Sequence, residues 1–180
     1  VMSSMKDQRI KAESILRGPA IQSFDMGSSA DGMSPLMDAM VLACMASYAQ
    51  GMELLRIASA EHNYNLNMTS IAQIWKGGCI IRARLLKRIQ DAFNANPQLE
   101  NLLIDPWFAD QVNRRLPGLA KVVAGAAAAG VPVPCLSSTL DYINSYRTSR
   151  LPQNLVQAMR DCFGSHTYER ADKDGTFHTE

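Results

Sequence analysis

The stretch Ser34-Pro-Leu-Met-Asp-Ala-Met-Val-Leu-Ala-Cys-Met-Ala-Ser-Tyr-Ala-Gln-Gly-Met-Glu-Leu-Leu-Arg-Ile-Ala-Ser-Ala60 decides the fold that we predict for this chain. Ser34 is a typical helix N-cap and Pro35 a typical first-turn residue, so together they predict a helix start. From Leu36 to Leu55 the residues are apolar or small on almost every side of the expected helix. Such a helix normally lies buried at the centre of a domain. We therefore expect an all-α fold organised around residues 34–60.

The same start and stop signals predict helices through the rest of the chain. Asp105-Pro106 repeats the cap and the proline and opens a long helix to about Ala129, which Gly130 and Pro132 end. Shorter helices are expected over residues 1–16, 71–93, 134–148 and 152–163, with a loosening at Gly77-Gly78 and a loop over residues 27–32. The pattern thus predicts a multi-helix bundle over residues 1–168.

Residues 169–180 differ from the rest, because they are polar and carry one large apolar side chain, Phe177. A segment of this composition cannot bury itself. We expect an extended C-terminal arm that is either disordered alone or lies on another chain.

The overall composition is that of one globular domain. The 180 residues are 47% hydrophobic and 19% charged, and 18 basic residues stand against 17 acidic ones. This balance gives no general argument for binding nucleic acid or an anionic membrane. No apolar run reaches the roughly 20 residues that span a bilayer, and the charged opening at Lys6-Asp7 predicts no signal peptide. We therefore expect neither nucleic acid nor membrane as a partner.

The cysteines and histidines predict no metal site. Four cysteines, at positions 44, 79, 135 and 162, share no metal-ligand spacing, and the three histidines are scattered. Cys44 and Cys79 lie among apolar or small residues, where a free thiol behaves as a small buried hydrophobe. A reduced, cytoplasmic protein without a metal is the expected context.

The segment Arg160-Asp-Cys-Phe-Gly-Ser-His166 gives the clearest functional hypothesis. Pro152 suits the start of a helix that ends at Phe163, and Gly164 suits the left-handed residue that stops it. Arg160 would lie in the last turn and His166 just beyond, so a short turn could bring both to one phosphate or carboxylate. A structural interpretation competes, because a cation in a last turn also faces the negative end of the helix dipole. The spacing leaves both open.

Two other clusters favour structural interpretations. The basic residues Arg82, Arg84, Lys87 and Arg88 are more often a solvated face or ion-pair partners than phosphate ligands. The glycines of Gly77-Gly78 lack the spacing of a nucleotide-binding loop, so we interpret them as a helix break where two helices pack closely. No nucleophile with an adjacent base, metal triad or pair of catalytic carboxylates emerges from the sequence.

Several blocks nevertheless resemble one known family. The segment Arg160-Asp-Cys-Phe-Gly-Ser-His-Thr-Tyr-Glu-Arg170 is similar to the C-terminal signature of the 6-phosphogluconate dehydrogenases. Four further blocks resemble the same family, in order along the chain: Ser47-Tyr-Ala-Gln-Gly-Met-Glu-Leu-Leu55, Ile74-Trp-Lys-Gly-Gly-Cys-Ile-Ile-Arg82, Asn101-Leu-Leu103 and Gly175-Thr-Phe-His178. The resemblance covers nearly the whole chain.

The resemblance implies the all-α C-terminal domain of a homodimeric, cytoplasmic enzyme without a metal. Such an enzyme oxidises 6-phosphogluconate with NADP and decarboxylates it to ribulose 5-phosphate. A lysine acts as the base for oxidation at the 3-hydroxyl, and a glutamate protonates the enediol after CO2 is lost. The C-terminal segment of one subunit completes the partner's substrate site. By resemblance, Arg160 and His166 are the substrate ligands there, with Arg160 on the phosphate, and Ile80 is a secondary candidate for a backbone contact.

The resemblance also implies that parts of the enzyme lie outside these 180 residues. They include the N-terminal NADP-binding domain with its glycine-rich loop, the catalytic lysine and glutamate, and a second phosphate-binding arginine directly before Val1. We therefore expect a fragment that is inactive alone. Within the family pattern, Met159, Cys162 and Ser165 replace a glutamine, a tyrosine and an alanine. The alternative hypothesis is a non-catalytic helical dimerisation module derived from the same fold.

Overall fold

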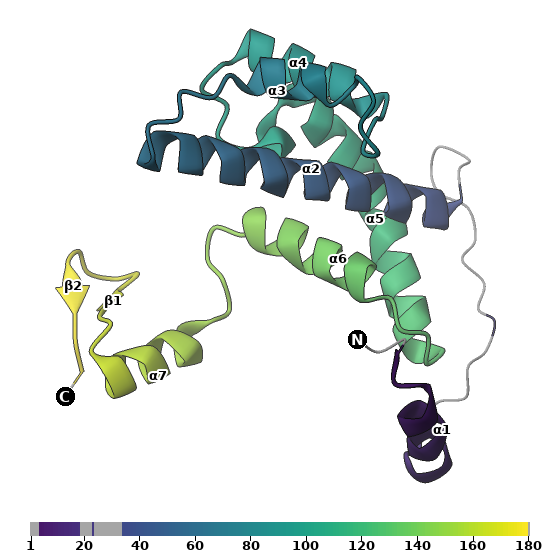
Figure 1. The fold of residues 1–180 in the computed structure, drawn as a ribbon. Helices are drawn as coiled ribbons and strands as arrows, with labels where there is room; N and C mark the ends of the chain where they lie inside the picture. The colour runs from purple at the N-terminus through teal and green to yellow at the C-terminus, as the bar shows by residue number, and fades with distance from the viewer. Residues whose placement is uncertain (1–3, 19–22, 24–33, 180) are drawn as a thin grey trace. The chain divides into compact units, whose positions relative to one another are not determined.

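The computed structural model divides into two compact units, unit 1 over residues 1–142 and unit 2 over residues 143–180. It describes residues 4–18, 23 and 34–179, so the loop expected at 27–32 lies outside the described residues. Helices dominate, as predicted, and a short hairpin follows them (Figure 1). The elements are α1 (Lys6–Ile15), α2 (Pro35–Glu61), α3 (Met68–Ile74), α4 (Leu85–Ala95), the 3-10 helix η2 (Leu102–Ile104), α5 (Pro106–Ala128), α6 (Pro134–Tyr146), α7 (Asn154–Gly164), β1 (Tyr168–Glu169) and β2 (Thr176–Phe177).

The two long helices begin where the sequence predicts. Ser34 Oγ accepts a hydrogen bond from the Leu36 N–H at 3.3 Å at the start of α2. Asp105 Oδ1 accepts hydrogen bonds from the N–H groups of Trp107 and Phe108, at 3.0 and 3.2 Å, at the start of α5. These side chains satisfy amides that have no partner within the helix. Helices α2 and α5 then form the main packing contact of unit 1.

The core of unit 1 lies against one face of α2. Fully buried apolar side chains come from α2, α4, η2 and α5, and they include Leu42, Met45, Met52, Leu86, Ile89, Leu102, Phe108 and Leu119. Other apolar side chains of α2 are exposed among the described residues: Met37, Met40, Leu54 and Ile57 are 46–67% exposed. The prediction of a fully buried helix is therefore wrong within the described part of the chain, and only one face is buried.

Two buried polar side chains fix the neighbours of α2. Asp38 is 1% exposed and forms a 2.7 Å ion pair with Arg115 of α5. Asn101, just before η2, is also 1% exposed, and its Nδ2 donates to Glu53 Oε2 and to the Tyr142 hydroxyl, each at 2.7 Å. Buried polar groups are costly unless they find partners. These contacts therefore hold α2 in register with α5, with η2 and with α6 at Tyr142.

The helix predicted over residues 71–93 is interrupted more strongly than expected. Helices α3 and α4 are separate, and residues 75–84 between them lie outside any helix. Gly78 has φ +85, a conformation that glycine adopts without steric cost. A Cβ built on Gly78 would meet no described atom within 4 Å. The break is confirmed, but close helix packing is the wrong reason for it.

The exposure of the cysteines and the length and apolarity of the helices bear on two further expectations, about thiol burial and about a membrane span. All four cysteines are free thiols, but Cys44 is exposed and Cys79 only half-buried, so the prediction that both are buried is wrong for Cys44 and only partly met by Cys79. Cys44 lines an open hollow between α2 and the segment of residues 75–85. None of the helices in the described part of the chain has the length and apolarity that a membrane span requires.

Candidate anion-binding site

Arg160 and His166 lie on α7 and on the turn that follows it, within unit 2. Helix α7 (Asn154–Gly164) begins after Pro152, so this proline precedes the helix and does not open it as predicted. The left-handed residue is Ser165, with φ 50, one position beyond the glycine expected in that role. The helix therefore extends one residue further than predicted, and the turn to His166 is tighter.

The glycine at the end of α7 allows the His166 ring to lie close to the helix. A Cβ built on Gly164 would lie 2.9 Å from His166 Cδ2 and 3.1 Å from His166 Nε2. Carbon atoms in contact normally lie about 3.5–4.0 Å apart. Any side chain at this position would therefore push the imidazole away from the helix end.

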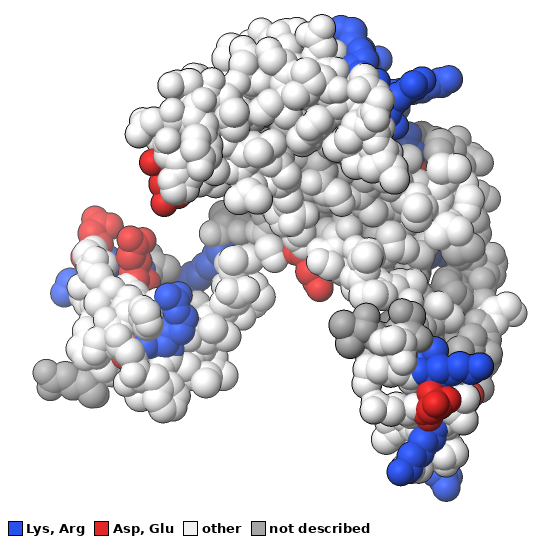
Figure 2. Space-filling model, viewed as in Figure 1, with Lys and Arg blue, Asp and Glu red and all other residues white. Residues whose placement is uncertain are grey.

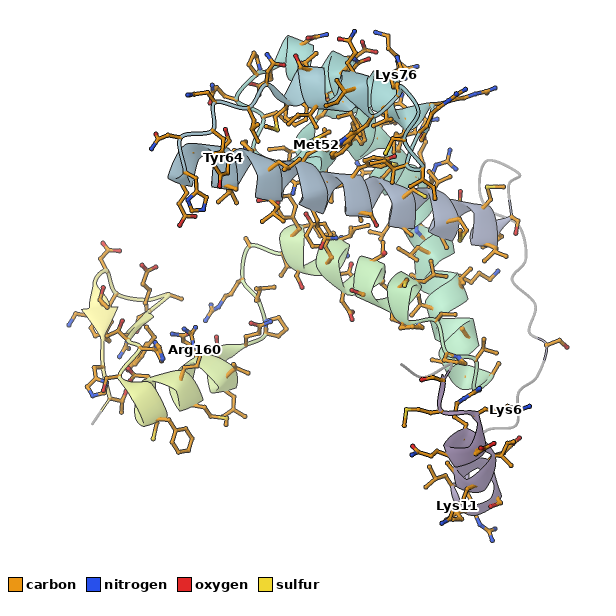
Figure 3. The ribbon with its side chains drawn as sticks, viewed as in Figure 1. Lys6, Lys11, Met52, Tyr64, Lys76 and Arg160 are labelled. Atoms are coloured by element: carbon orange, nitrogen blue, oxygen red, sulfur yellow. The ribbon has the colours of Figure 1, made fainter. Side chains whose placement is uncertain are left out.

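Arg160 and His166 line one open hollow on unit 2, so the structure brings these two candidates together. Both residues are exposed, and Figure 3 shows Arg160 on α7. The hollow also includes apolar side chains, among which Phe163 is 85% and Met159 50% exposed. In Figure 2 the segment formed by α7 and the hairpin carries both basic and acidic side chains. The local combination is therefore two nitrogen-bearing groups beside an uncovered apolar surface.

Two side chains of α7 fix this arrangement. Both polar atoms of the Gln157 amide form hydrogen bonds. Its Oε1 accepts from Arg160 Nη1 at 3.2 Å, and its Nε2 donates to the Thr167 carbonyl at 2.6 Å. Asp161 Oδ1 accepts from the Thr167 N–H at 2.8 Å. Thr167 has φ 58, so a left-handed residue stands on each side of His166. The backbone that carries the histidine is thus tied to the helix that carries the arginine.

Asp161 also holds the end of the described chain. Its Oδ1 lies 2.8 Å from His178 Nδ1, and its Oδ2 accepts from the Thr179 N–H at 2.8 Å. An ionised carboxylate only accepts hydrogen bonds, so Nδ1 of His178 is the donor in this contact. The hydrogen bonds from His178, Thr179 and Thr167 hold the pKa of Asp161 below its ordinary value. The carboxylate, 1% exposed, is therefore ionised and fully engaged.

The C-terminal residues have more structure than the sequence suggests. Strands β1 and β2 pair antiparallel, with Tyr168 opposite Phe177, and the chain then returns to Asp161. The expectation that the segment is disordered alone is therefore wrong for the described residues, and the expectation that it lies on another chain stays a prediction. A buried carboxylate supplies the anchor that the polar composition of the segment did not reveal.

Sequence reasoning did not identify Gln157, Asp161 or His178 as parts of this site. Asp161 and His178 are 17 positions apart, so no local spacing indicates their contact. One local signal was present. A carboxylate in the last turn of a helix faces the negative end of the dipole and is unfavourable there without donors nearby.

Ile80 belongs to unit 1, in the segment between α3 and α4, whereas Arg160 and His166 belong to unit 2. Its side chain is fully exposed at the edge of an apolar hollow beside α2. The Tyr48 hydroxyl of α2 donates to the carbonyl of Ile81, which fixes the segment. The structure thus gives Ile80 a defined backbone position.

The remaining clusters have structural partners. In the basic segment from Arg82 to Arg88, Lys87 forms a 2.5 Å ion pair with Asp91 on α4, and the Arg88 guanidinium lies 5.1 Å from the centroid of the Trp107 ring. These contacts agree with the structural interpretation of that segment. Among the described residues, no three side chains of histidine, cysteine, aspartate or glutamate lie together in a way that could hold a metal ion.

Comparison with known proteins gives one consistent family. The family model described as "6-phosphogluconate dehydrogenase, C-terminal domain" matches residues 1–180. The chain is 48% identical over 180 residues to the "6-phosphogluconate dehydrogenase, decarboxylating" of Synechococcus elongatus, and 47% identical over 179 residues to that of Escherichia coli. The two alignments include 100% and 99% of this chain, but only 38% of the length of either relative.

A solved structure gives the same result for the fold. The 6-phosphogluconate dehydrogenase of Plasmodium falciparum superposes with a TM-score of 0.86 at 42% sequence identity, over 99% of this chain and 38% of that one. Its description covers an apo form, a complex with its cofactor NADP+ and a complex with its substrate 6-phosphogluconate.

Proposed function

This chain belongs to the 6-phosphogluconate dehydrogenase C-terminal domain family, and we propose that the protein that carries it is a decarboxylating 6-phosphogluconate dehydrogenase. The reaction converts 6-phosphogluconate and NADP+ into ribulose 5-phosphate, CO2 and NADPH. The names of the relatives support this proposal, although the chain spans only 38% of their length. Within it, these 180 residues supply substrate-phosphate ligands and a dimer interface.

The observation that carries the proposal is the shared hollow of Arg160 and His166. An arginine and a histidine that line the same hollow suit a phosphate, because charge-assisted hydrogen bonds to its oxygens are short and strong. Gln157 orients Arg160, and Gly164 leaves room for the His166 ring. A cation that served only the helix dipole would need none of these arrangements.

The dimer part of the proposal rests on uncovered apolar surface. On α7, Leu155, Val156, Met159 and Phe163 are 50–85% exposed, and several apolar side chains of α2 are exposed as well. Contiguous exposed apolar side chains mark interaction surfaces. Because Arg160 and His166 share a hollow with three of these α7 residues, a subunit that covers the helix also meets both ligands. This supports the proposal that Arg160 and His166 of one subunit complete the substrate site of the partner subunit.

The described residues do not fit the cofactor. Dinucleotide binding of the usual kind needs a glycine-rich turn between a parallel strand and a helix. The strands of the described ranges are the two short strands of the antiparallel hairpin. We therefore assign no NADP ligand within this chain and place the cofactor on the remainder of the protein.

Kinetics of the full-length protein test the substrate role. We compare wild type, Arg160→Ala and the control Arg114→Ala by NADPH formation with 6-phosphogluconate. Loss of a charge-assisted phosphate contact costs about 1.5–3 kcal/mol, so Arg160→Ala should raise KM roughly 10- to 150-fold. Arg114 is exposed on α5 and pairs with Asp110, so its loss removes one charge and should leave KM unchanged. An unchanged KM in Arg160→Ala rejects the phosphate role.

The alternative is a helical dimerisation module without catalysis. It predicts a folded dimer with no NADPH formation in either variant or wild type. Light scattering on the same samples decides whether such inactivity accompanies an intact assembly.

A further inference from the structure

Asp161 connects three parts of unit 2 through one buried carboxylate. It belongs to α7, it accepts from the Thr167 N–H in the turn that carries His166, and it holds His178 and Thr179 at the end of the described chain. All three contacts measure 2.8 Å. Asp161 is not among the residues that line the hollow of Arg160 and His166. Its contacts are to the backbone and side chains that shape the turn.

The turn around His166 needs such support. Ser165 and Thr167 both have left-handed backbones, with φ 50 and 58, although neither is glycine. Residues other than glycine hold this conformation only where their surroundings over-determine it. The Ser165 N–H donates to the Asp161 carbonyl at 2.8 Å, and the Thr167 N–H to the Asp161 carboxylate. The same residue thus restrains the backbone on both sides of the histidine.

We infer that Asp161 is a positioning residue for His166, whose carboxylate couples the docking of residues 178–179 to the placement of the histidine turn. When the tail is docked, both carboxylate oxygens are occupied and the Thr167 amide is fixed. When it is released, the carboxylate loses two of its three donors, and only the Thr167 N–H still holds the Asp161 side chain in place, so the turn is less firmly restrained. The inference rests on the proposed function only where it concerns substrate, because the coupling of tail and turn is a property of unit 2 alone.

The carboxylate chemistry of Asp161 is essential to this coupling. Its oxygens face three N–H donors, and the lowered pKa of Asp161 follows from these hydrogen bonds, with that from His178 the largest contribution. Asparagine has the same shape but replaces one acceptor by an NH2 group. In Asp161→Asn the new NH2 group therefore faces one of the three N–H donors and cannot accept its hydrogen bond, while the volume of the side chain hardly changes.

Amide hydrogen exchange in the full-length protein tests the coupling directly. Asp161→Asn should raise exchange at least tenfold over residues 165–179, in the turn and the tail together, while residues 154–160 of α7 exchange as in wild type. The matched control is Asp172→Asn, which removes an exposed hairpin carboxylate that pairs with Arg170. It should leave exchange at residues 165–167 unchanged.

His178 provides a second test that does not disturb the core, since its side chain is 40% exposed. His178→Ala should raise exchange at Ser165–Thr167, more than ten positions away in sequence, as well as in the tail. His178→Asn retains an N–H donor near the position of Nδ1 and should restore protection. A turn that is protected equally in wild type and His178→Ala would overturn the coupling.

Kinetics complete the test. Asp161→Asn should raise KM for 6-phosphogluconate at least tenfold, no further than His166→Ala does, with a smaller effect on kcat. If Arg160→Ala raises KM but Asp161→Asn changes neither KM nor exchange, the positioning role is wrong and the proposed function stands. If Asp161→Asn raises exchange in turn and tail while neither Arg160→Ala nor His166→Ala alters KM, the coupling stands and the proposed function fails.

Discussion

Replacing Gly164 with alanine should separate the position of His166 from the stability of the fold. The new Cβ would lie 2.9 Å from His166 Cδ2, about 0.6 Å closer than a normal carbon contact of about 3.5 Å. The atom that must move is the outer part of a side chain, so the ring can rotate away without shifting α7. Alanine favours a helix over glycine by up to about 1 kcal/mol, and a strained rotamer costs about 0.5–1.5 kcal/mol. The free energy of unfolding should therefore change by less than about 1 kcal/mol.

The effect on function should be much larger. A histidine displaced from the hollow loses a phosphate contact of about 1.5–3 kcal/mol, which corresponds to a rise in KM of roughly 10- to 150-fold. The assay is NADPH formation by the full-length protein at varied 6-phosphogluconate, together with urea unfolding of the same samples.

A double-mutant cycle supplies the control. His166→Ala sets the ceiling, and Gly164→Ala combined with His166→Ala should be no worse than His166→Ala alone, because no ring remains to be displaced. If the two substitutions are additive in KM, or if Gly164→Ala leaves KM unchanged, the reason given for this glycine is refuted.

Three further predictions concern the packing and the pH response. Gly118→Ala should lower the free energy of unfolding by about 2–4 kcal/mol in urea, because the new Cβ would lie 2.6 Å from the buried Asp38 Oδ2 and disrupt its ion pair; Gly51→Ala, where no described atom lies within 4 Å, is the matched control and should not destabilise. Phe108→Ala should cost about 3–5 kcal/mol in the same assay, since the ring is fully buried, and a loss below about 1 kcal/mol would contradict its place in the core. Because the pKa of Asp161 is lowered in the folded protein, its contribution to stability is present above the ordinary aspartate range and is lost as the pH falls through the lowered value. The protection factors of the tail amides against hydrogen exchange should therefore stay constant from about pH 7 to 5 and fall below about pH 4. A loss of protection near neutral pH would mean that another titratable group holds the tail.

The parts of the fold that local chemistry controls were predictable from the sequence. Ser34 and Asp105 cap the helices they were expected to cap, because a short polar side chain before a proline has few other roles. The break at Gly78 was likewise foreseen, although its reason is the backbone conformation and not helix packing. These features depend on residues within a few positions of one another.

The site was predictable only in outline. Arg160 and His166 were chosen from their spacing, but the end of α7 was placed one residue early because glycine was assumed to be the left-handed residue. The ring of His166 occupies the space beside Gly164 instead, a contact that spacing alone does not show. The anchor at Asp161 requires that the chain turn back through a hairpin, so it depends on contacts far apart in sequence.

The two hydrogen bonds of the Gln157 side chain have a practical consequence for comparing related sequences. Its side chain must offer an acceptor to Arg160 and a donor to the Thr167 carbonyl. Glutamate has no donor when ionised, and lysine has no acceptor, so neither can replace it on both sides. A chain that retains the arginine and the histidine but has lost an amide at this position would look intact to a motif search, yet it would lack the link that runs from Arg160 through residue 157 to the Thr167 carbonyl. The amide at position 157 is therefore a feature to compare, beside the two ligands, when related sequences are sorted into functional and non-functional ones.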